Sequence, residues 1–116
     1  MLNMTDGLEE RIGLSRQEIE AFCRRWKIAE LSLFGSVLRD DFGPDSDIDF
    51  LAKFDPDAQW SLLDRADMQI ELSDRLHRKV DLLNRHGVEQ SRNRFRRIEI
   101  LKTARPLYVA PRQVGS

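Results

Sequence analysis

Two aspartates alternate with apolar residues in the segment Asp47-Ile48-Asp49-Phe50-Leu51, which has the period of a β-strand. Residues two apart on a strand point to the same face, so we expect Asp47 and Asp49 side by side and Ile48 and Phe50 on the opposite face. Two adjacent carboxylates in an apolar strand repel each other and are costly to desolvate. Their charge needs compensation, and a divalent cation is the simplest candidate.

A Gly-Ser turn lies ahead of this strand in the chain. The apolar segment Leu33-Phe34 predicts the end of an earlier strand, and it is followed by Gly35 and Ser36. Glycine lets the backbone approach a ligand closely, and the N–H groups that open a helical turn bind anions. Ser36 adds a hydroxyl donor, and the guanidinium of Arg39, one turn further on, could reach the same anion. These residues predict a phosphate-binding turn.

A third aspartate lies in a later apolar segment, Lys79-Val80-Asp81-Leu82-Leu83, which predicts a short strand. A carboxylate there is costly unless it is paired or bound to metal. Pairing with a nearby lysine or arginine stays an alternative. Together with Asp47 and Asp49, Asp81 would supply the oxygen ligands that Mg²⁺ prefers, and two such ions can clamp the attacking and leaving oxygens of a phosphoryl displacement.

The bulk properties indicate one soluble domain. The chain has 116 residues, 41% of them hydrophobic, and its 19 basic and 20 acidic residues nearly balance. Basic residues crowd the segment 85–105, which we interpret as a solvated face, so direct binding of nucleic acid is not expected. Cys23 is the only cysteine and fits a buried position in a cytoplasmic protein. No apolar segment has the roughly 20 residues of a membrane span, so no membrane association is expected.

The order of predicted elements alternates between helices and strands. Helices are expected over 15–26, 60–77 and 91–103, a helical turn over 36–40, strands over 29–34, 47–54, 79–83 and 107–109, and loops over 41–46 and 84–90. The fold class is therefore α/β or α+β, a small mixed sheet with helices packed against it. The short connection between the first two strands favours an antiparallel pair. We expect a loose segment over 1–14, one domain over 15–109 and a loose tail over 110–116.

Apolar residues at helical spacing predict which helix faces are buried. In the helix over 60–77 these are Trp60, Leu63, Ala66 and Ile70, with three further leucines beside them, Leu62, Leu72 and Leu76. In the helix over 91–103, Phe95, Ile98 and Leu101 are expected to face inward.

The joint pattern resembles a known family. Gly35-Ser36, ten intervening residues and Asp47-Ile48-Asp49 resemble the signature of the nucleotidyltransferase superfamily, which has the polymerase-beta-like fold. The longer text LFGSVLRDDFGPDSDIDFL resembles its minimal nucleotidyltransferase (MNT) branch. Val80-Asp81-Leu82 matches the place where that branch carries its third carboxylate, and the segment 100–108 resembles its C-terminal end. The resemblance implies a nucleotidyltransferase fold over most of residues 31–108.

The resemblance also implies an activity. A hydroxyl would attack the α-phosphate of ATP, with Mg²⁺ bound at a two-ion site, and pyrophosphate would leave. By position, Asp47, Asp49 and Asp81 would be the catalytic metal ligands, and Asp81 could also help to deprotonate the acceptor hydroxyl. Gly35 and Ser36 would hold the β- and γ-phosphates, with Arg39 as a further nucleotide contact.

Small proteins of the MNT branch occur as antitoxins beside HEPN-domain ribonuclease toxins. The resemblance implies that the chain transfers AMP to a tyrosine of such a toxin and forms a hetero-oligomer with it. Two alternatives stay open. One is a nucleotidyltransferase for a small molecule such as an aminoglycoside, and the other is an antitoxin that masks its toxin by binding without catalysis.

Overall fold

The computed structural model describes residues 7–111. Its elements in chain order are α1 (Leu8–Ile12), α2 (Arg16–Arg25), β1 (Ile28–Phe34), the 3₁₀ turn η1 (Gly35–Leu38), β2 (Ile48–Phe54), α3 (Leu62–Leu76), β3 (Val80–Asn84), α4 (Arg85–Glu89), α5 (Arg94–Thr103) and β4 (Arg105–Val109). The predicted strands and the mixed α/β class are confirmed.

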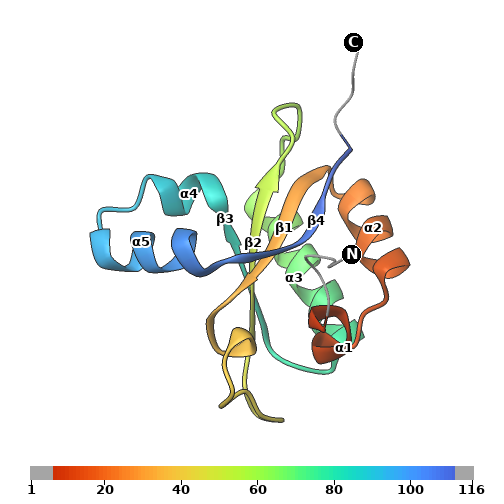
Figure 1. The fold of residues 1–116 in the computed structure, drawn as a ribbon. Coiled ribbons are helices and arrows are strands. Elements are labelled where there is room, and N and C mark those ends of the chain that lie inside the picture. The colour runs from red at the N-terminus through yellow and green to blue at the C-terminus, as the bar shows by residue number, and fades with distance from the viewer. Residues whose placement is uncertain (1–6, 112–116) are drawn as a thin grey trace.

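The four strands form one mixed sheet in the order β3-β2-β1-β4 (Figure 1). β1 is antiparallel to β2, as their short connection predicted, and it is also antiparallel to β4. β2 and β3 are parallel, and α3 forms the crossover that a parallel pair requires. Consequently β2 lies in the interior of the sheet, with a neighbouring strand on each side.

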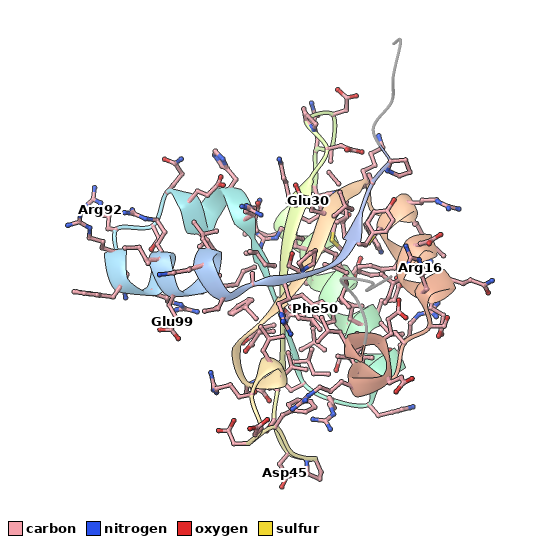
Figure 2. All side chains as sticks on the ribbon, viewed as in Figure 1. Arg16, Glu30, Asp45, Phe50, Arg92 and Glu99 are labelled. Carbon is pink, nitrogen blue, oxygen red and sulfur yellow. The ribbon has the colours of Figure 1, made fainter. Side chains whose placement is uncertain are left out.

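The two faces of the sheet carry different numbers of helices. α1, α2 and α3 cover one face, while α4 and α5 lie on the other (Figure 1). The larger core contains the fully buried side chains of Ile19, Leu33, Phe50 and Met68. Figure 2 shows Phe50 inside the molecule and Arg92 at the outer end of the α4–α5 pair. The smaller core has only four buried residues, Phe34, Leu51, Val88 and Ile100, so the second face is thinly covered.

Side-chain caps fix the starts of α2 and α3. At α2, Ser15 Oγ accepts from Glu18 N at 3.1 Å, and Ser15 N donates to Glu18 Oε1 at 3.0 Å, the capping box that the sequence predicted. Ser61 and Asp64 repeat this arrangement at α3, which begins two residues later than expected. Each cap contributes about 1 kcal/mol of helix stability.

The predicted inward faces of the last two long helices are partly wrong. In α3 the buried residues are Met68, Leu72 and Leu76, whereas Leu62 and Leu63 are 82% and 78% exposed. In α5 only Ile100 is buried, and two of the residues expected to face inward are exposed, Phe95 by 86% and Ile98 by 50%. The apolar residues do have helical spacing. However, those at the exposed positions form a second apolar side of each helix, which the described part of the chain does not cover.

Two segments expected to be irregular contain helices. Residues 8–12 form α1, and Leu8 and Ile12, four apart on one face, are buried in the larger core. Residues 85–89, expected as loop, form α4, whose first turn is capped by the Asn84 side chain accepting from His86 N at 3.0 Å. Five-residue helices carry too few apolar positions for a periodic signal. Residues 1–6 and 112–116, within the predicted loose ends, lie outside the described part of the chain.

No helix in the described range 7–111 has both the length and the apolar character needed to cross a membrane.

Candidate functional site

Gly35 joins β1 to the 3₁₀ turn in a conformation that glycine alone adopts readily. Its φ is +80°, in the left-handed region that L side chains avoid. A Cβ atom at this position would overlap Asp49 Oδ2 and lie 3.4 Å from Asp49 Cγ. The backbone of the turn therefore approaches the Asp49 carboxylate more closely than any side chain would permit.

Strand pairing explains this close approach. The register of β1 and β2 pairs Phe34 with Asp49, so the turn that follows Phe34 begins beside that carboxylate. On the other side of β2, the parallel register pairs Asp49 with Asp81. Asp47 lies immediately before β2, two residues from Asp49. The sheet thus assembles three aspartates and the Gly-Ser turn around one position of β2.

The three carboxylates differ in their environments. Asp47 and Asp49 are half-buried, while Asp81 is exposed, so the expected cost of burying Asp81 does not arise. Burial raises the pKa of Asp49, and the negative charges of Asp81 and Asp47 raise it further. The guanidinium groups of Arg96 and Arg39 act in the opposite direction on this pKa. The site therefore has an excess of negative charge that a cation would relieve.

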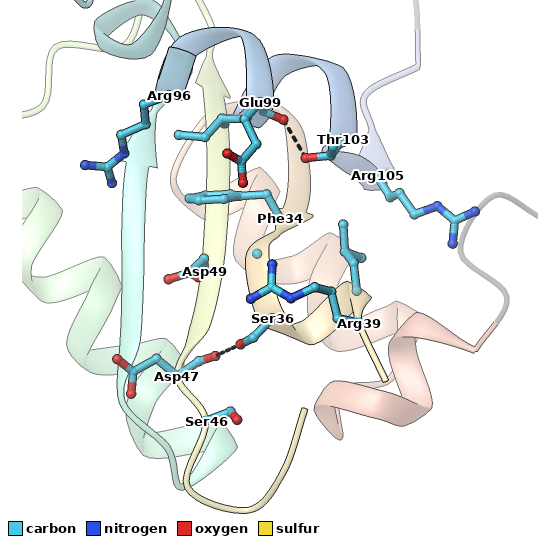
Figure 3. A pocket seen from close by; sticks show the side chains of 13 residues that line it. Phe34, Ser36, Arg39, Ser46, Asp47, Asp49, Arg96, Glu99, Thr103 and Arg105 are labelled. Atoms are coloured by element: carbon cyan, nitrogen blue, oxygen red, sulfur yellow. Dashed lines mark hydrogen bonds between the residues drawn. The ribbon is translucent and has the colours of Figure 1, made fainter. Parts of the chain in front are cut away.

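A cavity of about 900 Å³ opens over this cluster, between η1, the start of β2 and α5 (Figure 3). Five of the six predicted site residues line it, namely Gly35, Ser36, Arg39, Asp47 and Asp49. Asp81 does not line it, although its register partner Asp49 does. The volume is within the range of about 300–1,000 Å³ typical of ligand pockets.

Contacts within the cavity hold the turn in place. Ser36 Oγ donates to the Asp47 carbonyl oxygen at 3.4 Å, which ties the start of η1 to the start of β2 (Figure 3). Arg39 Nε lies 3.4 Å from Asp41 Oδ1, and both side chains are exposed. Such an exposed pair is worth at most about 1 kcal/mol, so the Arg39 guanidinium can turn to another anion at little cost.

The far wall of the cavity comes from α5 and the start of β4, which the sequence interpretation treated as a solvated face. Arg96, Glu99, Thr103 and Arg105 all line the cavity. Figure 3 shows Arg96 on the β3 side of Asp49 and Arg105 on the opposite side of the cavity. The crowding of arginines in this segment was the available signal, but the position of α5 over the sheet depends on tertiary packing.

The oxygen donors fit a hard cation that is shared with a ligand. Within residues 7–111, no group of three or more His, Cys, Asp or Glu side chains is arranged as a complete metal site. Mg²⁺ is usually bound by one or two carboxylates together with water and substrate phosphates, rather than by a cage of protein ligands. Asp47 and Asp49 on one wall of an open cavity have this character.

The chain belongs to the nucleotidyltransferase domain family, whose profile matches residues 15–107. This match spans the Gly-Ser turn and all three aspartates, and it confirms the family resemblance seen in the sequence. None of the curated proteins searched matched the chain.

Solved structures of the minimal branch share the fold. A candidate minimal nucleotidyltransferase is 28% identical, with a TM-score of 0.63, over 90% of this chain and 96% of that one. A toxin–antitoxin structure with AMP-PNP contains a chain with a TM-score of 0.64 and 19% identity, covering 84% of this chain and 75% of its own length. A third match, with a TM-score of 0.56 and 18% identity, covers 82% of this chain and 70% of the other. It comes from a tri-AMPylated Shewanella oneidensis HEPN toxin in complex with its MNT antitoxin.

Proposed function

We propose that this protein is an Mg²⁺-dependent adenylyltransferase that transfers AMP from ATP to a tyrosine hydroxyl of a HEPN-domain ribonuclease toxin, and so acts as its antitoxin. The observation that carries the proposal is the Gly35–Ser36 turn packed against Asp49, with Asp47 and Asp81 beside it, at the edge of a cavity of nucleotide size. The nucleotidyltransferase family assignment supports the reaction class.

Each side chain has a role in this proposal. Asp47 and Asp49 would hold Mg²⁺ together with phosphate oxygens of ATP. When bound, the metal supplies positive charge to the phosphates and relieves the repulsion around Asp49. Gly35 and Ser36 would hold the β- and γ-phosphates by backbone N–H groups and the hydroxyl, and Arg39 would add a charge-assisted contact. Asp81, exposed and in register with Asp49, is open to an acceptor arriving from outside.

The transfer step is an in-line displacement at the α-phosphorus. The acceptor oxygen forms a bond to the α-phosphorus, and the bond from that phosphorus to the bridging oxygen of the β-phosphate breaks. Pyrophosphate leaves with the electron pair, and Asp81 takes the proton of the acceptor hydroxyl. A carboxylate does this work best when it lies within hydrogen-bond reach of the hydroxyl.

A protein acceptor suits the shape of this chain. The cavity is open, and no second domain in residues 7–111 encloses it, so a partner has access to the carboxylates. One structural relative was solved with AMP-PNP, and another with an AMPylated HEPN toxin. These properties of the relatives support ATP as the donor and a toxin as the acceptor.

The test is transfer of label from α-³²P-ATP to a co-purified HEPN protein in the presence of Mg²⁺. We expect label on a tyrosine of the HEPN protein, with loss of its ribonuclease activity. The double variant Asp47→Ala/Asp49→Ala should transfer no label. Asp45→Ala is the matched control, because Asp45 is an exposed aspartate of the same loop that does not line the cavity.

Each alternative function gives a different result. If the Asp47→Ala/Asp49→Ala protein neutralises the toxin fully without label transfer, the chain masks its toxin by binding. If label reaches an aminoglycoside and not the HEPN protein, the acceptor is a small molecule. Either result would refute the proposed protein adenylylation.

A further inference from the structure

A second cavity, of about 280 Å³, lies beside the first on the same side of the sheet. Its floor is apolar and includes Leu83 from β3 and Ile100 from α5, and α4 contributes Gly87 to its rim. Arg96 and Ile100 line both cavities, so these two residues form the boundary between them.

The second cavity is next to the exposed aspartate of the site. Asp81 and Leu83 are two apart on β3, so both side chains point to the same face, and Leu83 lines the cavity. Asp81 is also the register partner of Asp49, which lines the first cavity. Asp81 itself lines neither cavity, but its register partner Asp49 lines the first and Leu83, two residues further along β3, lines the second, so the Asp49–Asp81 pair lies close to both.

The second cavity carries an excess of positive charge. Arg65, Arg96 and Arg97 line it, and within the described chain none of them forms an ion pair with a carboxylate. Arg97 Nη1 donates to the Ser91 carbonyl oxygen at 2.9 Å, and Arg65 Nη2 donates to the Leu82 carbonyl oxygen at 3.3 Å. These neutral acceptors hold the guanidinium groups of Arg65 and Arg97 in position and leave the charge of these two groups uncompensated. Among residues 7–111, the buried Arg65 Nε has no hydrogen-bond partner.

We propose that this second cavity is the acceptor subsite, and that it binds an oxyanion, a phosphate or a carboxylate, that the acceptor carries close to its reacting hydroxyl. The inference rests on the proposed nucleotidyl transfer, because an acceptor subsite is needed only if the chain transfers a nucleotide to an acceptor. Guanidinium groups bind both oxyanions through paired N–H donors. The apolar floor of Leu83, Val88 and Ile100 would contact the part of the acceptor that carries the anion.

Gly87 offers a substitution that changes the cavity and leaves its arginines intact. A Cβ at Gly87 meets no atom within 4 Å, and its φ lies outside the left-handed region, so larger side chains are tolerated there. Gly87→Glu places a carboxylate among the arginines, and Gly87→Gln is the neutral variant of the same size. Arg94→Gln is a charge control, since Arg94 is an exposed arginine of α5 that lines neither cavity.

The first experiment needs neither ATP nor an acceptor protein. The ¹⁵N-labelled protein is titrated with inorganic phosphate and, separately, with acetate, and backbone amide shifts are followed by NMR. We expect shifts at Asn84 and Ser91 in the wild type, in Gly87→Gln and in Arg94→Gln, with at least tenfold weaker binding in Gly87→Glu. Equal affinity in the Glu and Gln variants, or shifts confined to Gly35 and Ser36, would overturn the subsite.

The two probes separate the sources of the anion. Binding of phosphate alone indicates an acceptor that carries a phosphate beside its hydroxyl, such as a nucleotide attached earlier. Binding of both probes indicates an acidic side chain beside the hydroxyl. Either result supports an oxyanion subsite.

The second experiment measures transfer to the HEPN protein. Gly87→Glu should raise the KM for the acceptor at least tenfold relative to Gly87→Gln, with the KM for ATP equal in the two variants. Equal acceptor KM values would refute the inference even where transfer occurs. If the wild type transfers no nucleotide, the proposed function fails, while the phosphate titration still decides whether the oxyanion site exists.

Discussion

The substitution Gly35→Ala separates two effects that the structure combines at one residue. The first effect is conformational, because a side chain at φ +80° costs roughly 1–2 kcal/mol. For a chain of 116 residues the entropy of unfolding is about 0.24 kcal/mol/K, so this cost corresponds to a decrease in Tm of about 4–8 °C. The second effect is steric, because the new Cβ overlaps Asp49 Oδ2 and must displace that carboxylate.

Gly13→Ala is the matched control for the conformational effect. Gly13 has φ +81°, and a Cβ there meets nothing within 4 Å. This variant is therefore destabilised by the backbone conformation alone, without a steric clash. We expect the Gly13 variant to lose 4–8 °C in Tm while keeping full activity. The Gly35 variant should lose at least as much Tm, and a carboxylate displaced by about 1 Å should also reduce its activity by about 10²-fold.

Thermal unfolding followed by circular dichroism gives Tm, and calorimetry with Mg²⁺ and AMP-PNP gives the affinity for nucleotide. The rate of label transfer from ATP completes the comparison. If Gly35→Ala kept wild-type nucleotide affinity and transfer rate, close packing of the turn against Asp49 would not matter for the site. If both glycine variants lost activity equally, the loss would come from stability and not from the clash.

Three further predictions concern single side chains. The pKa of Asp49 is higher in the folded protein than in the unfolded chain. The protonated side chain therefore contributes stability at pH values below the unfolded-state pKa, and this stability is lost as the pH rises through the folded-state pKa. Asp49→Asn should therefore raise Tm at pH 7.5 without metal by about 1–4 °C, from relief of about 0.2–1 kcal/mol of like-charge repulsion, and the gain should shrink at lower pH. An unchanged or lower Tm at pH 7.5 would contradict the repulsion. Burial raises the pKa of Cys23 to about 12, so its thiol should not react with a disulfide reagent at pH 8 until the protein unfolds. Trp60 Nε1 donates to the Trp26 carbonyl oxygen at 2.7 Å, and Trp60→Phe should cost about 1 kcal/mol, or about 4 °C in Tm; a change below 1 °C would argue against that bond.

The strands and the capping box of α2 were accessible from the sequence because they depend on neighbouring residues. The alternation around Asp49 fixed the strand period, and the capping box of Ser15 and Glu18 fixed the start of α2. The buried faces of α3 and α5 were less accessible. Phe95 and Ile98 have the spacing of a buried face, but spacing does not say whether the chain itself or something else covers it.

The α5 wall of the site was not predicted for a related reason. Arg96 and Arg105 look like any exposed arginines in the sequence, and their position around the cavity follows from the way α5 packs through Ile100 onto the thinly covered face of the sheet. Asp81 shows the converse. Its apolar neighbours suggested burial, yet they face the core while Asp81 itself is exposed on the other side of β3.

The mixed direction of the strands is what makes a charged site feasible in a small domain. An antiparallel partner brings the end of β1, and with it the Gly-Ser turn, beside Asp49, while a parallel partner brings Asp81 beside it from the other side. Each segment arrives from a different part of the chain, so no single loop has to fold around the charges. The larger core lies on the opposite face of the sheet. The burial and charge repulsion that raise the pKa of Asp49 therefore act on one face, while Phe50, the next residue, packs into the core on the other. The thin cover of the carboxylate face leaves two adjoining cavities open on that face, one of them lined by Asp47 and Asp49.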